Sequence, residues 1–283
     1  MEQTVFIHMT DLHVGDAGDT HLFSDTVETL EQILADVAKV EPRPSFIVAS
    51  GDLTNRGDAE SFRRLKAIME RSGLPVVYAL GNHDTRPGFY EGMGVEATGP
   101  EAPYDHDTVI DGVHIITLDS TSPGLIGGTI ENEQFAWLEE ALDRHADLPK
   151  LIVSHHAPAL DETAAEAPWR AIRLEDSERL GTLLRDRMQK GRTILGILSG
   201  HIHHDRVSMW NGIMVVVGMG QHAATDLLRT DVLRMVKGAS FGICTVRRTG
   251  LTVAFVPQPS NREELNVYPL DMLRKAVMQL AAE

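Results

Sequence analysis

The chain has 283 residues, of which 42% are hydrophobic and 24% are charged, and its formal net charge is -15. A chain of this length can bury a large core, so we expect one main domain. The acidic balance argues against sequence-independent binding to nucleic acid or to an anionic membrane, because both need clustered Lys and Arg. We therefore expect neither a nucleic-acid partner nor a membrane partner.

The chain contains a single cysteine, Cys244. One cysteine excludes an internal disulfide and fits a reducing compartment, and its apolar surroundings predict a small buried side chain. Residues 1–4 lead directly into strand-like sequence, without the basic and apolar regions of a secretory signal. The longest apolar runs, such as 213–217, are far shorter than the ~20 residues that cross a bilayer. These features predict a cytoplasmic protein.

In chain order, the sequence first predicts alternating strands and helices. Ser24 and Asp58 are suitable N-caps for two helices, the first ending before Pro42 and the second at Gly73. Later apolar residues at helical spacing predict further helices over 133–145 and 176–189. The apolar runs expected to form strands are 7–10, 46–49, 76–80, 113–118, 151–153 and 194–198.

Beyond Asp205 the sequence predicts closely spaced strands. The expected strands are 213–217, 241–246 and 251–256, and the last two are joined by a short hairpin connection over 247–250. Sequential βα units followed by such strands predict an α/β (α+β) fold, a four-layer α-β-β-α sandwich of two packed mixed β-sheets flanked by helices. Residues 266–280 carry an apolar helical face that either docks on the core or forms a subunit contact.

Five of the strand-like runs end in residues that can bind a metal ion. The residues at these ends are Asp11, His13, Asp52, Asn82, His155, His201 and His203. Ligands of open α/β sheets bind outside the carboxyl ends of the strands, so these distant side chains can converge in one crevice. Asp11 and His13 are two residues apart and would point the same way in extended backbone, while Gly51 permits a tight turn before Asp52. We therefore expect a metal site at the strand ends.

The order of these motifs resembles the calcineurin-like metallophosphoesterases. The chain reads Asp-X-His, Gly-Asp, Gly-Asn-His-Asp, a later His, and Gly-His-X-His, across roughly residues 4 to 204. Residues 51–54, 80–84 and 118–120 are most similar to the bacterial class III cyclic-nucleotide phosphodiesterase and glycerophosphodiesterase branch. We expect a catalytic domain over 1–265, with a motif core over 4–204 that carries the resemblance and C-terminal strands over 205–260. A C-terminal helix over 266–283 would follow it, for docking or for an oligomer contact.

The resemblance also implies two metal ions. One would be held by Asp11, His13, Asp52 and His203. The other would be held by Asp52, Asn82, His155 and His201, with His156 as the alternative to His155. Mixed oxygen and nitrogen ligands suit Fe, Mn, Zn or Co better than Ca, and the sequence does not choose among them.

Two neighbouring ions can clamp a phosphoryl group and activate a water, so the expected reaction is direct attack of hydroxide on phosphorus. His83 is the expected acid or phosphate-oxygen donor, and Asp84 either orients its ring or caps the following turn. The side chains expected near the substrate are Asn55, Arg56, His204 and His222. The alternatives are a solvated loop position for Arg56, support of the adjoining ligand pair for His204, and no role at the site for His222. Residues 157–175 are expected to form a rim or a lid, where Trp169 either stacks on a base or anchors the loop.

The function that fits these features is hydrolysis of small phosphodiesters, of the cyclic-nucleotide or glycerophosphodiester type. The alternatives are a phosphodiesterase for phosphonate esters, a broad-specificity phosphatase, and a non-catalytic protein-binding scaffold. A nuclease is disfavoured by the net charge and by the lack of a basic aromatic groove. The expected partner is a small-molecule phosphate ester, and a homo-oligomer through the C-terminal helix stays open.

Overall fold

A computed structural model describes residues 3–15, 22–162, 167–229, 231–261 and 269. The first of its two large sheets has the strand order β13-β12-β1-β2-β3. Its strands are β1 (Thr4–Met9), β2 (Ile47–Ser50), β3 (Val76–Ala79), β12 (Ala239–Arg247) and β13 (Gly250–Gln258). Strands β1, β2 and β3 are parallel, whereas β12 runs antiparallel to both β1 and β13, so the sheet is mixed.

The second large sheet has the order β4-β5-β6-β7-β9-β8. Its strands are β4 (His106–Ile110), β5 (Val113–Thr117), β6 (Lys150–Val153), β7 (Ile194–Ser199), β8 (Arg206–Trp210) and β9 (Ile213–Val217). The four inner strands are parallel, and β4 and β8 are antiparallel edge strands. A small hairpin of β10 (Ala224–Thr225) and β11 (Met235–Val236) follows the second sheet in sequence.

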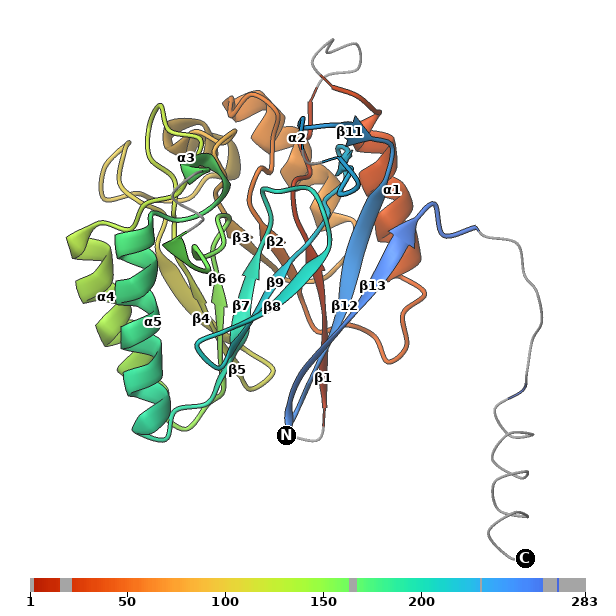
Figure 1. Cartoon of the computed structure of the whole chain (residues 1–283). Coiled ribbons are helices and arrows are strands. Elements are labelled where there is room, and N and C mark those ends of the chain that lie inside the picture. The colour runs from red at the N-terminus through yellow and green to blue at the C-terminus, as the bar shows by residue number, and fades with distance from the viewer. Residues whose placement is uncertain (1–2, 16–21, 163–166, 230, 262–268, 270–283) are drawn as a thin grey trace, which may run out of the picture.

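Three apolar clusters fill the interfaces between four layers. One cluster contains Phe6, Phe46, Val153, Leu198 and Cys244, and therefore joins the two sheets face to face. A second packs the first sheet against α1 (Thr26–Val37) and α2 (Ala59–Glu70). The third packs the second sheet against α4 (Asn132–Asp143) and α5 (Leu174–Gln189). The predicted α-β-β-α sandwich is thus confirmed, with one helical pair on each outer face (Figure 1).

Most predicted elements form, with small shifts at their ends. The first helix is capped by Asp25, whose carboxylate accepts from Glu28 N–H at 2.9 Å, so the prediction of Ser24 as N-cap is wrong. Ser24 Oγ instead donates to the His222 carbonyl at 2.9 Å. Asp58 caps α2 as predicted, but that helix ends at Glu70 rather than at Gly73.

Some elements were not predicted. The helix α3 (Arg86–Met93) begins after Thr85, whose hydroxyl accepts from Gly88 N–H, and ends at Gly94 with a φ of 68°. These cap signals are present in the sequence, but α3 lacks a long apolar stripe. The edge strands β4 and β8 are only partly buried, which weakens their alternating pattern.

Two further expectations concern the C-terminal helix and membrane-spanning helices. The predicted C-terminal helix over 266–283 lies outside the described residues, apart from Pro269. In the described ranges, no helix combines the length and apolar character that crossing a membrane requires.

Candidate metal centre

The loops that follow β1, β2 and β7 bring four of the predicted ligands together. The donor atoms of Asp11, His13, Asp52 and His203 all lie within 4.8 Å of one another. His13 Nε2 lies 3.6 Å from Asp52 Oδ2, and His203 Nε2 lies 3.3 Å from Asp11 Oδ1. The first three side chains are almost completely buried, so this is a closed group of two carboxylates and two imidazoles.

Backbone pairing beyond the strand ends sets this arrangement. Asp11 N–H donates to Gly51 O and His13 N–H donates to Asp52 O, each at 2.9 Å. The loops after β1 and β2 therefore continue side by side and hold their side chains in register. On the second sheet, Gly200 N–H donates to the His155 carbonyl at 2.9 Å and fixes the loops after β6 and β7 in the same way.

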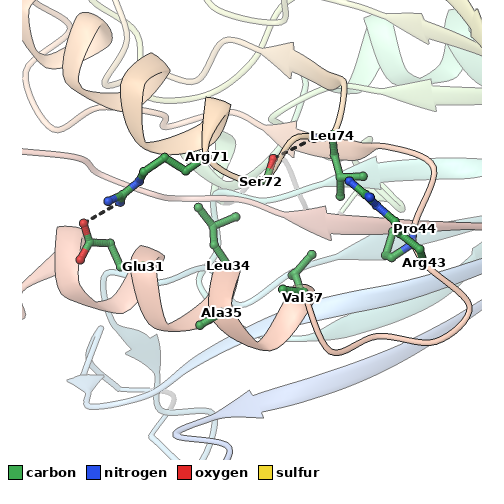
Figure 2. Close-up of a pocket in the computed structure, with 10 residues that line it drawn as sticks. Glu31, Leu34, Ala35, Val37, Arg43, Pro44, Arg71, Ser72 and Leu74 are labelled. Carbon is green, nitrogen blue, oxygen red and sulfur yellow. Dashed lines mark hydrogen bonds and ion pairs between the residues drawn. The ribbon is translucent and has the colours of Figure 1, made fainter.

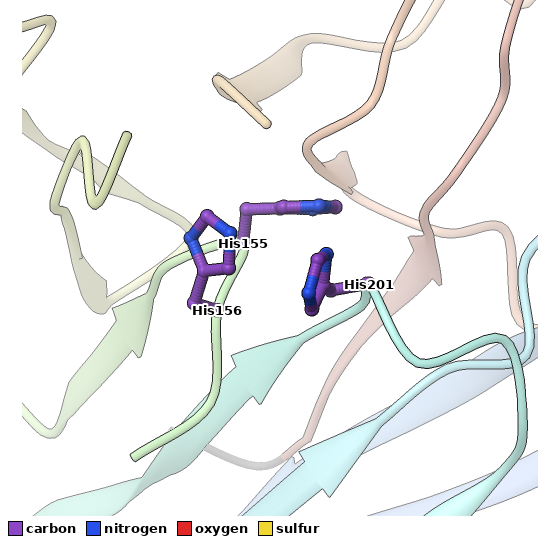
Figure 3. Close-up of side chains that lie close together, drawn as sticks. All are labelled: His155, His156 and His201. Atoms are coloured by element: carbon purple, nitrogen blue, oxygen red, sulfur yellow. The ribbon is translucent and has the colours of Figure 1, made fainter. Parts of the chain in front are cut away.

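A second group of donors lies beside the first and shares Asp52. His155, His156 and His201 place one nitrogen each within 4.8 Å of one another (Figure 3). His155 Nε2 lies 3.3 Å from Asp52 Oδ2, so this carboxylate stands between the two groups. The turn that carries Asn82 also rests on Asp52, because His83 N–H donates to Asp52 Oδ1 at 2.9 Å.

His155 and His156 differ in their free nitrogens. His156 Nδ1 lies 2.8 Å from Ser120 Oγ and its Nε2 lies 2.8 Å from the Ile126 carbonyl, so both nitrogens have protein partners. His155 uses only Nδ1, which contacts the Ser50 carbonyl at 3.0 Å. Its Nε2 is near Asp52 without hydrogen-bond geometry. His155 therefore has a nitrogen to offer a cation, and His156 has none.

The donors fit a metal site because several of them are buried without a hydrogen-bond partner among the described residues. These atoms are both ring nitrogens of His13, Asn82 Oδ1 and His155 Nε2. Leaving such a buried polar atom unpaired costs about 1–3 kcal/mol, so four of them in one place are strongly unfavourable. Cations bound here would satisfy one nitrogen of His13 together with Asn82 Oδ1 and His155 Nε2, and all of these atoms belong to predicted ligands.

The electrostatics of the two groups also favour cation binding. Burial lowers the pKa of His13 well below its usual value and lowers that of His201 to about 4, so both rings are neutral ligands near neutral pH. Burial opposes charge on His155 as well, but the neighbouring Asp52 carboxylate outweighs it and raises the pKa of His155 to about 9. His155 would therefore have to give up a proton before its Nε2 could hold a cation.

Backbone strain is concentrated at the same residues. Five of the eight described non-glycine residues with positive φ are predicted ligands: Asp11, His13, Asp52, His201 and His203. The expectation that Asp11 and His13 share a direction through extended backbone is wrong, because their φ angles are 49° and 44°. Left-handed backbone at such residues costs on the order of 1–3 kcal/mol each and typically occurs at functional sites.

The motif glycines provide space for ligands from other loops. A Cβ on Gly51 would lie 2.4 Å from His155 Nδ1, and one on Gly81 would lie 2.3 Å from Asp52 Oδ1. A Cβ on Gly200 would lie 2.4 Å from Asp11 Oδ2. Of these three glycines only Gly51 has a positive φ, so the other two are required by close packing rather than by a turn.

His83 lies at the edge of the centre with its side chain exposed to solvent. Its ring contacts the His13 ring edge to face at 4.7 Å, and its Nδ1 lies 3.2 Å from the Asn55 carbonyl. That carbonyl, and not Asp84, orients the His83 ring. The Asp84 carboxylate instead accepts from Leu53, Thr54 and Gly81 N–H groups and ties the loop after β2 to the turn after β3.

The remaining predicted substrate contacts differ in their positions. The His222 ring lies 4.6 Å from the His13 ring, so His222 borders the centre. His204 Nδ1 contacts the carbonyl of Ile202 at 2.9 Å and is half-buried. Asn55 contributes its backbone carbonyl to His83, and Arg56 beside it is exposed.

Two features of the surroundings were not predicted. Phe23 packs its ring on His222 at a centroid distance of 5.0 Å, although nothing near Phe23 in the sequence signals a site. The carbonyl of Trp169, in the short 3-10 turn Pro168–Arg170, lies 2.6 Å from His201 Nε2. The predicted rim therefore touches the centre through its backbone.

The molecule also has a surface groove of about 520 Å³ between α1 and the end of α2 (Figure 2). Its lining includes Leu34, Val37 and Leu74, with Arg43 and Arg71 at the rim. None of the predicted ligands lines this groove. The predicted metal site therefore lies at the strand ends, away from this groove.

Comparison with known proteins agrees with this geometry. The family model described as calcineurin-like phosphoesterase matches residues 4–205. A probable cyclic nucleotide phosphodiesterase of Rhodococcus erythropolis is 31% identical over 228 residues, which cover 78% of this chain and 72% of that protein. A cAMP/cGMP dual specificity phosphodiesterase of Mycobacterium tuberculosis is 32% identical over 232 residues, covering 79% of this chain and 69% of that protein.

Among solved structures, a purple acid phosphatase from yellow lupin seeds has a similar fold. Its TM-score is 0.66 at 15% sequence identity, and the match covers 93% of this chain and 53% of the lupin chain. At this identity the likeness concerns the arrangement of the two sheets and their helices alone.

Proposed function

The chain belongs to the calcineurin-like phosphoesterase family, and on that premise we propose that it is a metal-dependent phosphodiesterase that hydrolyses small phosphodiesters, cyclic nucleotides foremost. The observation that carries the proposal is the closed group of Asp11, His13, Asp52 and His203, with His155 and His201 beside it and His155 Nε2 3.3 Å from Asp52 Oδ2. A non-catalytic scaffold would have no need to keep four unpaired buried donors and five strained ligands in one place. The names of the two relatives support cyclic nucleotides as the first substrates to test.

We assign two cations to the centre, of Fe, Mn, Zn or Co. The first would be held by Asp11, His13, Asp52 and His203, and the second by Asp52, Asn82, His155 and His201. When bound, two such ions polarise the phosphoryl oxygens and lower the pKa of a water molecule. The oxygen and nitrogen donors suit these metals better than Ca.

Backbone carbonyls orient the imidazole rings so that one nitrogen of each would face a cation. The nitrogens that lie on carbonyls are His155 Nδ1 on Ser50, His203 Nδ1 on Ala223 and His201 Nε2 on Trp169. Each contact fixes the ring and assigns the opposite nitrogen to the cation. His155 and His203 would therefore bind through Nε2, and His201 would bind through Nδ1.

His83 is suited to move a proton to the leaving group. Its Nδ1 donates to the Asn55 carbonyl, which leaves Nε2 as the nitrogen that exchanges a proton with the substrate. The backbone of His83 is held by Asp52, so the ring keeps a fixed position relative to the centre. When the phosphodiester is cleaved, protonated Nε2 would give its proton to the departing alkoxide.

The test combines metal analysis with a panel of substrates. Metal-loaded protein should hydrolyse cyclic nucleotides, glycerophosphodiesters, phosphonate esters and phosphomonoesters at rates that rank its preference. His83→Ala should keep its metal and lose on the order of a hundredfold to ten-thousandfold in turnover. If loaded wild-type protein hydrolyses none of these esters, nor bis(p-nitrophenyl) phosphate, the scaffold alternative replaces this proposal.

The state of the cysteine bears on the compartment. The single cysteine is completely buried, and burial raises the pKa of its thiol, so Cys244 is unreactive and structural. A chain without disulfides fits a reducing compartment, and we propose the cytoplasm.

A further inference from the structure

An exposed aromatic ring stands beside the metal centre without a role in the mechanism above. Phe23 is 70% exposed, although it is a large apolar side chain. One face of its ring is stacked on the His222 ring at 5.0 Å, with an angle of 9° between the planes. Since so much of Phe23 is exposed, the opposite face is open in the part of the chain that the structure describes.

The position of this ring relative to the metal centre is fixed by several contacts. The Phe23 N–H donates to His222 Nε2 at 3.2 Å, and Ser24 Oγ donates to the His222 carbonyl at 2.9 Å. His222 in turn lies against His13, a proposed ligand, with 4.6 Å between the ring centroids. Phe23 is therefore already oriented before a ligand binds. Little further side-chain entropy is lost when a ligand stacks on it.

Trp169, the other exposed aromatic near the centre, is less suited to the same role. It is 37% exposed, and the Arg170 guanidinium lies over its ring at 4.7 Å. One face of each ring is therefore covered, and the Trp169 side chain leaves about half as much of its surface exposed as that of Phe23. Its carbonyl is also tied to His201, so the backbone of Trp169 already supports the metal centre.

Phe23 lies one ring away from a proposed metal ligand. One imidazole ring, that of His222, separates Phe23 from His13. In a mononucleotide, one sugar ring separates the base from the phosphate. A nucleotide whose phosphate lies at the metal centre would extend past His222 to bring its base to the open face of Phe23, and a planar base stacks well on an aromatic side chain.

We propose that Phe23 is the stacking surface for the base of a mononucleotide phosphodiester, and that it selects such substrates over esters without an aromatic group. The inference rests on the proposed function, because it places the phosphate at the metal centre. Phe23 would act on binding and not on the chemical step, so its effect should be found in KM and in the inhibition constants of nucleotides.

The test uses pairs of ligands that differ by the base. Adenosine 5′-monophosphate and ribose 5-phosphate serve as inhibitors, and adenosine 3′,5′-cyclic phosphate and glycerophosphocholine serve as substrates. Stacking of one base changes affinity by roughly five- to a hundredfold. In Phe23→Leu, which keeps the apolar volume, the preference of the protein for the base-bearing member of each pair should fall by about tenfold. Phe23→Tyr and Phe23→Trp keep an aromatic ring and should restore the preference.

Each outcome has a distinct meaning. If Phe23→Leu changes both members of each pair equally, or changes neither, the inference is wrong although the proposed function stands. If Trp169→Leu rather than Phe23→Leu removes the preference, the base stacks on the opposite side of the centre and the inference is again wrong. If loaded wild-type protein hydrolyses no phosphodiester, the proposed function itself fails.

Discussion

Replacing Gly200 with alanine tests whether the metal centre depends on close contact between the loops that follow β1 and β7. The new Cβ would lie 1.9 Å from Thr10 Oγ1 and 2.4 Å from Asp11 Oδ2, whereas ordinary contacts begin at 3.4 Å. The φ of Gly200 is not in the left-handed region, so backbone strain does not contribute. The effect of the substitution is therefore steric.

The size of the effect follows from the displacement. The Asp11 carboxylate would have to retreat by roughly 1 Å, and misplacing a group in an active site by that distance can cost on the order of a hundredfold in rate. The same movement weakens the two contacts from His201 N–H to the Asp11 oxygens, which are 3.1 and 3.0 Å long. Overpacking of this kind also lowers the free energy of unfolding by about 1–3 kcal/mol.

The assay measures metal content, turnover of bis(p-nitrophenyl) phosphate and thermal unfolding in the same preparation. Gly99→Ala is the matched control, because a Cβ at Gly99 has nothing within 4 Å. Thr10→Ala removes the nearest clashing atom, so the double variant should recover part of the stability but not the position of Asp11. Wild-type metal content and turnover in Gly200→Ala would refute the reasoning.

Three further results are expected. His155→Ala should lose part of its bound metal. His156→Ala should keep its metal but unfold more easily, because the His156 ring contacts Ser120 and Ile126. Equal metal content in both variants would contradict this. Removing metal with a chelator should lower Tm, with recovery on adding Mn, since a cation that binds only the native state stabilises it; an unchanged Tm would argue against a native metal site. Burial lowers the pKa of His8 to about 4, so the unfolded state takes up a proton between pH 6.5 and 4 while the native state does not. The contribution of His8 to the free energy of unfolding should therefore be fully present above pH 6.5 and should fall by up to about 3 kcal/mol toward pH 4. Urea titrations of metal-free protein measure this dependence, and His8→Gln should make it less steep.

Much of the fold and the identity of the metal-binding donors could be predicted, because local sequence patterns indicate both. Buried strands are continuous apolar runs, and helices such as α2 show their cap and apolar stripe within a few turns. The donors follow these strands directly, so their position at the strand ends needs only the rule that ligands bind there. The elements α3, β4 and β8 were not predicted, because short or exposed elements show little hydrophobic periodicity.

The sequence by itself therefore determined which residue types could bind metal and which strands would carry them. Only the tertiary structure decided which nitrogen of each histidine is free, that His155 rather than His156 faces Asp52, and that Gly200 packs on Asp11. It also placed Phe23 on His222, although 199 positions separate them in the chain. The physical reason is that these contacts join loops of different strands and sheets. Their distances depend on strand register and on how the two sheets pack, which no local pattern contains.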